Sequence, residues 1–498
     1  MRTESTAGNR AVVAALLAAA IVPYLASIGF GYVLDDTTVI RSNAALNGWS
    51  SLWRVWTLPY GGLEDHYTGL YRPLTMTLFA VVWNAGRHWI LWFHLLAILM
   101  NAFAALLVWR LLSRAIGRTP AILAALFFAA HPVHVEAVAN VSNSSEVLVT
   151  IFTCVLALYL SRISKAGQVD WRRASIAGLL YLCAFLSKES GAVAAPLALL
   201  WTWGWRRNDD QMPPPEGRFM SRWWRVVAGF VLAAIVVFFA RATVLGSSVA
   251  KESIAAAGLE GSGIERAWRM LSLGPRIAAL LLWPTTTNPH YGPTAFPEWR
   301  SVLAALTALA VIGAVLLSLK SARKGDRRLV VAVLWTLIAF LPASNLFVAT
   351  GQVLAERTLY LTSAGVAMLV GLLLDELERY SAALGPRRIW YIAFAVVIAV
   401  DTYFVGRAAI WTFVWRNNHS VFTQIVAADP RAYRGYWLLG LEARYLGRKD
   451  EGIDLLERAH SLYPRDRGLL LDLRGALLER GDTARAHSID SELAALTR

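Results

Sequence analysis

The chain has 498 residues, of which 56% are hydrophobic and only 16% are charged, and its mean hydropathy is +0.47. This composition excludes an ordinary soluble globular domain, in which about one quarter of the residues are charged. The net charge of +14 does not indicate a nucleic-acid partner, because the basic residues lie in short segments between apolar runs and form no arginine-aromatic groove. The composition therefore predicts an all-α, polytopic membrane protein embedded in the lipid bilayer.

Apolar runs long enough to cross a bilayer recur from the N-terminus to about Val405. A spanning helix needs roughly 17 to 25 predominantly apolar residues, and on this basis we expect about eleven spans. Two of them are short and form a tight hairpin around residues 187–190. The expected spans are 11–29, 92–112, 120–138, 147–163, 174–186, 191–204, 226–240, 302–319, 329–347, 359–374 and 389–405.

Basic residues between these runs predict the topology, since short cytoplasmic loops are enriched in Lys and Arg. All the basic loops fall on one side if the segment 277–283, which ends at Pro284, does not cross the bilayer. The non-cytoplasmic side then holds a first outer loop (30–91), a second outer loop (245–300) and the C-terminus. The loops expected in the cytoplasm contain Arg110, Arg114, Arg118, Arg162, Lys165, Arg172, Arg173, Arg206, Arg207, Arg218, Arg222, Lys320, Arg323, Lys324, Arg327, Arg328, Arg387 and Arg388.

A soluble composition follows the last span, and its spacing predicts a helical repeat. Pro430 precedes Pro464 by 34 residues, and Gly447 precedes Gly481 by the same interval. This is the period of tetratricopeptide repeats, which are pairs of helices that bind peptides or protein partners. We therefore divide the chain into a membrane domain (1–408) and a tetratricopeptide-repeat domain (418–498). A helical cap without a binding role is the alternative.

Asp35 and Asp36, in the sequence GYVLDDTTVI, directly follow the first span at the outer edge of the bilayer. Carboxylates in such a place are either solvated or part of a functional site, because an unpaired charge near hydrocarbon is costly. A carboxylate there can take a proton from a substrate hydroxyl as a general base. We therefore choose Asp35 and Asp36 as catalytic candidates, without deciding between them. Helix capping is the alternative role.

The sequence HPVHVEAVANVSNSSE places His131, His134, Glu136 and Glu146 where the third span meets the outer face. Side chains three to five residues apart can converge at a helix end, and histidines with carboxylates can bind a divalent metal. Hydrogen-bonded histidines at an interface are commoner than metal ligands. We therefore expect no metal and no other cofactor here, with a divalent metal as the alternative, and we assign His131, His134 and Glu136 to substrate positioning.

Two charged pairs, Lys188-Glu189 in SKESG and Glu356-Arg357 in LAERTLYL, lie in strongly apolar surroundings. Such charges face a wet cavity or pair with each other, and a lipid phosphate would offer them a counter-charge. Arginines can grip a phosphate with two parallel hydrogen bonds. Ion pairs that only hold helices together are the alternative. The candidates for phosphate binding are Arg357, Lys188 and Arg72 of GLYRPLT, and those for substrate positioning are Glu189, Glu356 and Tyr360.

Five motifs occur in order ahead of the repeats: the Asp35-Asp36 pair, YRPLT (71–75), HPVHVEAVA (131–139), SKESG (187–191) and LPASN followed by AERTLYL. Together they resemble the transmembrane and tetratricopeptide-repeat containing O-mannosyltransferases over nearly the whole chain. The resemblance implies the C-type fold of membrane glycosyltransferases and inverting transfer of mannose from a polyprenyl- or dolichyl-phosphate donor to Ser or Thr hydroxyls of a polypeptide. It also implies that an acidic residue of the first outer loop is near the chemistry, a role we carry to Asp35 or Asp36 only.

The chain has fewer repeats than animal members of that family, and its Ala- and Arg-rich sequence indicates a bacterial inner membrane with the site on the periplasmic side. Three alternatives stay open: a transferase of the same fold that modifies a lipid or cell-envelope glycan, a transporter, and a membrane-anchored scaffold. A transporter is disfavoured because the charges gather at the outer edge of the bilayer rather than at its midplane. The sequence lacks a P-loop and a dinucleotide fingerprint, so a nucleotide-sugar donor is not expected.

Overall fold

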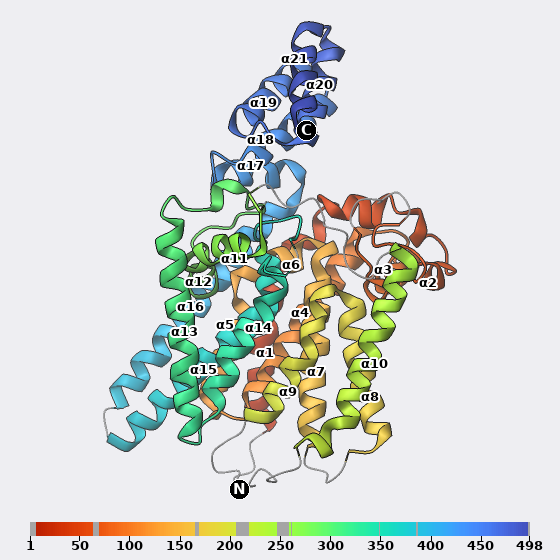
Figure 1. Cartoon of the computed structure of the whole chain (residues 1–498). Coiled ribbons are helices and arrows are strands. Elements are labelled where there is room, and N and C mark those ends of the chain that lie inside the picture. The colour runs from red at the N-terminus through yellow and green to blue at the C-terminus, as the bar shows by residue number, and fades with distance from the viewer. Residues whose placement is uncertain are drawn as a thin grey trace.

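The structure is a computed structural model that describes residues 6–62, 69–164, 169–205, 219–246, 258–259, 261–347, 349–384 and 387–496. Helices form a bundle, and a separate helical array made by residues 418–496 rises from one end of it (Figure 1). Within the described ranges, β-type pairing is confined to one bridge between Tyr291 and Leu354. The all-α class expected from the sequence is therefore confirmed for this part of the chain.

Some expected features fall outside the described residues. They are four basic residues expected in the cytoplasm (Lys165, Arg206, Arg207 and Arg218), residues 63–68 of the first outer loop, and residues 247–257 and 260 of the second.

Seven helices among the described residues are long and apolar enough to cross a membrane, or eight if the bent pair α5–α6 counts as one span. The protein is thus a multi-pass membrane protein. The helices of the membrane domain are α1 (Thr6–Ile21), α4 (Ile90–Leu112), α5 (Arg118–Ala130), α6 (Val135–Ala139), α7 (Ser145–Ile163), α8 (Trp171–Ser187), α9 (Ala194–Gly204), α10 (Phe219–Leu245), α13 (Arg300–Arg323), α14 (Arg328–Phe340), α15 (Tyr360–Leu384) and α16 (Arg387–Thr412).

Seven or eight spans are fewer than the eleven expected, because several expected spans are short or bent. The expected span 120–138 is bent by 43° between α5 and the segment Pro132–Ala139. His131 at this break has ψ of 124°, the extended conformation that a residue before proline favours. The helices α8, α9 and α14 have 17, 11 and 13 residues, and at 1.5 Å per residue they are shorter than a full span.

Two glycines bring α8 and α10 close together within the bundle. A Cβ added to Gly178 would lie 3.1 Å from the carbonyl oxygen of Gly229 on the facing helix. Small residues at such a crossing allow membrane helices to pack backbone against backbone. This packing fixes the outer end of α10, which carries Arg241, beside the loop that follows α8.

The outer loops cap one end of the bundle (Figure 1). The first outer loop contains α2 (Ser51–Arg54) and α3 (Pro73–Ala85), and the second contains α11 (Gly263–Ser272) and α12 (Gly274–Leu282). Trp49 and Trp53 of the first loop are 58% and 81% exposed, which suits the membrane interface, where tryptophan is enriched. The helix α12 has nine residues, so it is too short to span.

The C-terminal array consists of α17 (Asn418–Ala428), α18 (Tyr433–Tyr445), α19 (Lys449–Leu462), α20 (Arg467–Arg480) and α21 (Thr483–Leu496). The pair α18–α19 and the pair α20–α21 repeat after 34 residues, since both helices of the second pair begin 34 positions after those of the first. Gly447 and Gly481 follow α18 and α20 with φ of 82° and 86°. Glycine is favoured at such left-handed helix ends.

Candidate functional site

Asp35 and Asp36 lie in a tight turn just before one turn of π-helix, η2 (Thr37–Arg41). The amide of Asp36 donates to the carbonyl oxygen of Val33 at 3.0 Å and closes the turn. Leu34 has φ of 50°, a left-handed conformation that costs a non-glycine residue about 1 to 2 kcal/mol. The strained turn gives the two neighbouring aspartates different environments.

Asp36 is completely buried and fastens the turn to the membrane domain. Its Oδ1 atom accepts the amide hydrogen of Ser142 at 2.8 Å, and its Oδ2 atom accepts that of Val33 at 3.3 Å. Burial raises the pKa of Asp36 to about 7. That pKa would suit a general base near neutral pH, but both oxygens face backbone amides and the side chain does not line the cavity described below. Asp36 is therefore a structural anchor.

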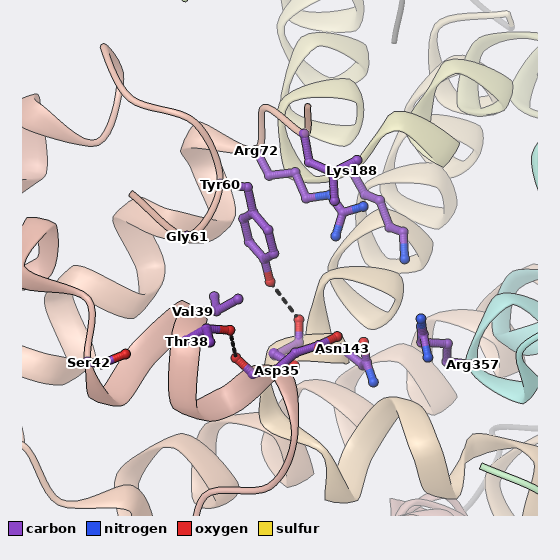
Figure 2. A pocket seen from close by; sticks show the side chains of 12 residues that line it. Asp35, Thr38, Val39, Ser42, Tyr60, Gly61, Arg72, Asn143, Lys188 and Arg357 are labelled. Carbon is purple, nitrogen blue, oxygen red and sulfur yellow. Dashed lines mark hydrogen bonds between the residues drawn. The ribbon is translucent and has the colours of Figure 1, made fainter. Parts of the chain in front are cut away.

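Asp35 is exposed and faces a cavity of about 440 Å³ at the outer end of the bundle (Figure 2). Within the described residues its carboxylate makes no hydrogen bond; only its backbone oxygen accepts one, from Thr38 Oγ1 at 3.2 Å. The carboxylate is thus available to a substrate. The cavity is lined by Asp35, Thr38, Val39, Ser42, Tyr60, Gly61, Leu70, Arg72, Ser142, Asn143, Lys188 and Arg357.

Three cations expected from the sequence line the same cavity as Asp35. Figure 2 shows Arg72 and Lys188 on one side of the space, Arg357 on another, and Asp35 facing them. They come from the start of α3, the end of α8 and the segment before α15, three parts of the chain far apart in sequence. Such a set of cations around an open space can hold an anionic group.

Each cation is held in place by a buried or half-buried glutamate. Arg72 contacts Glu189 through Nε at 2.9 Å and through Nη2 at 2.8 Å. The guanidinium of Arg72 also lies 4.7 Å from the ring centroid of Tyr60, a cation–π distance. Glu189 further pairs with Arg241 at 3.4 Å. Glu189, which the sequence assigned to substrate positioning, is thus a partner of Arg72 and does not line the cavity.

Lys188 and Arg357 also have glutamate partners. Lys188 Nζ lies 2.7 Å from Glu146 Oε1. Arg357 is paired with Glu136 through Nη1, and its amide donates to Glu136 Oε2 at 2.9 Å. Glu136 is only 2% exposed, so its role in this structure is to orient Arg357. Because the guanidinium of Arg357 is directed by a buried carboxylate, its position on the cavity wall is defined before any ligand arrives.

Asn143 is a cavity residue that the sequence did not single out. Its side chain is 6% exposed, and its Nδ2 atom is buried without a hydrogen-bond partner among the described residues. A buried amide without a partner is costly unless a ligand or water satisfies it. The signal in the sequence was the polar run NVSNSS within an apolar stretch, which marks the loop but not the residue. Tyr60 was also missed; its hydroxyl donates to Ser142 O at 3.0 Å.

Glu356 holds the second outer loop against the bundle. Its carboxylate accepts hydrogen bonds from Thr287 Oγ1 at 2.8 Å, the Asn288 amide at 2.7 Å and Tyr291 Oη at 2.8 Å. These donors come from the loop that follows α12 and satisfy both carboxylate oxygens. Glu356 is 2% exposed. It binds the second outer loop and does not line the cavity, although its neighbour Arg357 does.

His131, His134 and Tyr360 lie inside the bundle, away from the cavity. His131 Nε2 lies 3.0 Å from Leu281 O, and its Nδ1 accepts the Val133 amide at 3.2 Å. His134 Nε2 is 2.8 Å from Ser363 Oγ, and its ring packs 4.1 Å from that of Tyr360. Among the described residues no group of three His, Cys, Asp or Glu side chains is arranged to hold a metal ion. These residues are therefore used in packing between helices.

Known proteins with similar sequences point to one family. A family described as dolichyl-phosphate-mannose-protein mannosyltransferase matches residues 67–213. Protein O-mannosyl-transferase Tmtc3 of Drosophila melanogaster is 26% identical over 94% of this chain and 56% of its own length. Protein O-mannosyl-transferase TMTC4 of Mus musculus is 25% identical over 82% of this chain and 61% of its own. The chain thus spans little more than half the length of these relatives.

A solved oligosaccharyltransferase of Archaeoglobus fulgidus, crystallised with Zn and sulfate, is 14% identical over 84% of this chain and 57% of its own, with a TM-score of 0.44. The sequence relatives cover most of the chain, and each is named a protein O-mannosyl-transferase. The chain is a relative of the protein O-mannosyl-transferases, a family of glycosyltransferases, as the order of its sequence motifs predicts.

Proposed function

We propose that the protein transfers mannose from a polyprenyl-phosphate carrier to Ser or Thr hydroxyls of polypeptides on the non-cytoplasmic face of the membrane. The observation that carries this proposal is the shared cavity of Asp35, Arg72, Lys188 and Arg357. A lipid-phosphate sugar brings one anionic phosphate and one electrophilic carbon to such a site. The names of the similar proteins and of the matching family support mannose as the sugar and protein as the acceptor.

The chemistry is a single inverting displacement at the anomeric carbon. Asp35 takes the proton from the acceptor hydroxyl while that oxygen bonds to the anomeric carbon. The bond from this carbon to the phosphate oxygen breaks, and the lipid phosphate leaves with the electron pair. Arg72, Lys188 and Arg357 stabilise the negative charge that develops on the leaving phosphate, and the Asn143 amide donates to a phosphate or sugar oxygen.

The remaining architecture follows from the same proposal. The shorter helices α8, α9 and α14 complete a C-type transferase fold of about eleven spans, and the bilayer thins locally around them. The membrane domain is residues 1–408, and the 34-residue helix pairs of residues 418–498 are tetratricopeptide repeats that present the acceptor polypeptide. The basic loops lie in the cytoplasm, so the cavity and the repeats face the periplasm.

The test is sugar transfer by the full chain in vesicles that contain synthetic polyprenyl-phosphate mannose and a Ser/Thr-rich peptide. Asp35→Asn should lower kcat by at least about 100-fold and leave donor binding intact. Glu298→Gln is the matched control, because Glu298 is an exposed carboxylate of the second outer loop away from the cavity. Transfer at the parental rate by Asp35→Asn would overturn the assignment of the base. Transfer to lipid or glycan but never to peptide would overturn the acceptor.

A further inference from the structure

The side chain of Asn418 joins the C-terminal array to the turn of residues 33–37, which carries Asp35. Asn418 Oδ1 accepts the amide hydrogen of Leu34 at 2.9 Å, across a sequence separation of 384 residues. Asn418 is the first residue of α17, whose cap is its neighbour: Asn417 Oδ1 accepts the amide hydrogen of Ser420 at 2.9 Å. The helix therefore does not need the Asn418 side chain for capping, and that side chain reaches outside the helix to the first outer loop.

The residue that Asn418 holds is the strained one. Leu34 has φ of 50°, and its carbonyl oxygen accepts the Thr37 amide hydrogen at 3.1 Å within the turn. A residue in this region persists only when its surroundings fix it. Both neighbours of Asp35 are thus fixed by hydrogen bonds. The Leu34 amide donates to Asn418, and the Asp36 carboxylate accepts the Ser142 amide hydrogen.

Further contacts join α17 and the segment before it to the outer loops, in addition to the hydrogen bond between Leu34 and Asn418. The rings of Phe30 and Phe413 lie 5.6 Å apart, just before the turn and just before α17. Gln424 Nε2 donates to Thr287 O at 2.9 Å, in the loop that Glu356 holds. The start of the array therefore bears on the first and the second outer loop, next to the membrane domain (Figure 1).

We propose that Asn418 is a positioning residue for Asp35: by holding the Leu34 amide it fixes the turn that directs the Asp35 carboxylate into the cavity. A neutral amide supplies the acceptor oxygen here without adding a second negative charge beside Asp35, which would disfavour the ionised base. The catalytic geometry of the membrane domain thus depends on the first helix of the C-terminal array. This inference rests on the proposed transferase function.

The experiment compares the full chain with Asn418→Ala, Asn418→Asp and His419→Ala in vesicles with the mannose donor and peptide described above. Small displacements of a catalytic group cost orders of magnitude in rate, so Asn418→Ala should lower kcat about 10-fold and leave the donor KM within about 2-fold. Asn418→Asp keeps an acceptor oxygen but adds a negative charge beside Asp35, so it should hold the turn with near-parental hydrogen exchange and recover only part of kcat. His419→Ala is the control, since His419 bonds Glu442 of the array rather than the first outer loop.

Amide hydrogen exchange of the peptide 30–42 is the second readout, and it does not depend on transfer. Faster exchange in Asn418→Ala than in His419→Ala, together with the fall in kcat, supports the proposal. Equal exchange or an unchanged kcat overturns it. If the parent transfers no sugar at all, the proposed function fails, and the exchange comparison alone decides whether Asn418 holds the turn.

Discussion

Asp36 and Ser142 join the first outer loop to the membrane domain, because Asp36 Oδ1 accepts the Ser142 amide hydrogen at 2.8 Å across 106 residues of sequence. Ser142 also lines the cavity and accepts the hydroxyl hydrogen of Tyr60 through its carbonyl oxygen. Ser142, which lies three positions before α7, thus binds two parts of the first outer loop. The loop cannot shift relative to the cavity without breaking a buried hydrogen bond.

We expect the stability of the folded protein to fall as the pH rises from about 4 to about 7. Burial raises the pKa of Asp36 from 3.8 to about 7, so the folded protein keeps a proton that the unfolded chain has already lost. The stability from this group is fully present below about pH 4 and is lost as the pH rises through about 7. Asp36→Asn cannot titrate, and the thermal midpoint measured in detergent should then depend less on pH. Asp35→Asn should keep the parental slope, and a parental slope in Asp36→Asn would contradict the role of this carboxyl group.

Replacing Arg357 by Lys should raise the donor KM by about 10-fold to 100-fold. The charge is kept, but an ammonium cannot reproduce the two parallel hydrogen bonds of a guanidinium to phosphate or its contact with Glu136. Arg41→Lys is the control, because Arg41 is an exposed arginine of the first outer loop that does not line the cavity. The donor KM is measured at a saturating concentration of acceptor peptide. A KM unchanged by Arg357→Lys would mean that Arg357 does not contact the phosphate.

Replacing Glu356 by Gln should release the second outer loop. The amide keeps one acceptor oxygen but cannot accept the hydrogen bonds made to the other, and a hydrogen bond to a charged group contributes about 1.5 to 3 kcal/mol. We expect faster protease cleavage within residues 284–299 and a lower thermal midpoint. Thr285→Ser nearby, which changes no bond of Glu356, should leave both unchanged. Resistance to cleavage equal to that of the parent would show that other contacts hold the loop.

The positions of helices could be predicted from the sequence wherever a local pattern is enough to define the helix. Apolar runs located the long helices such as α4 and α7, and the 34-residue spacing located the helix pairs of the array. The proline after His131 predicts a break there, but the apolar run before it led us to expect one continuous span over 120–138. The short lengths of α8 and α9 were expected from their short apolar runs, and the structure joins the two helices by the turn at residues 188–193.

The site was predicted as a set of residues but not as an arrangement. The motifs named Asp35, Arg72, Lys188 and Arg357, which line one cavity. Choosing between Asp35 and Asp36 was beyond the sequence, because the choice depends on Ser142, a partner 106 residues away. The same holds for Glu136 and Glu356, whose partners are fixed only by the folded bundle.

The ion pairs around the cavity also bear on how the reaction ends. Three lining cations (Arg72, Lys188 and Arg357) and Arg241 behind them are equal in number to the carboxylates of Glu189, Glu146, Glu136 and Asp35. This cluster therefore carries almost no net charge. The donor phosphodiester has one negative charge, whereas the spent lipid phosphate is a monoester with nearly two. A strongly positive pocket would retain that more anionic product and be poisoned by it. In the proposed reaction, cations that already have partners would release the spent carrier to the bilayer and so permit repeated turnover.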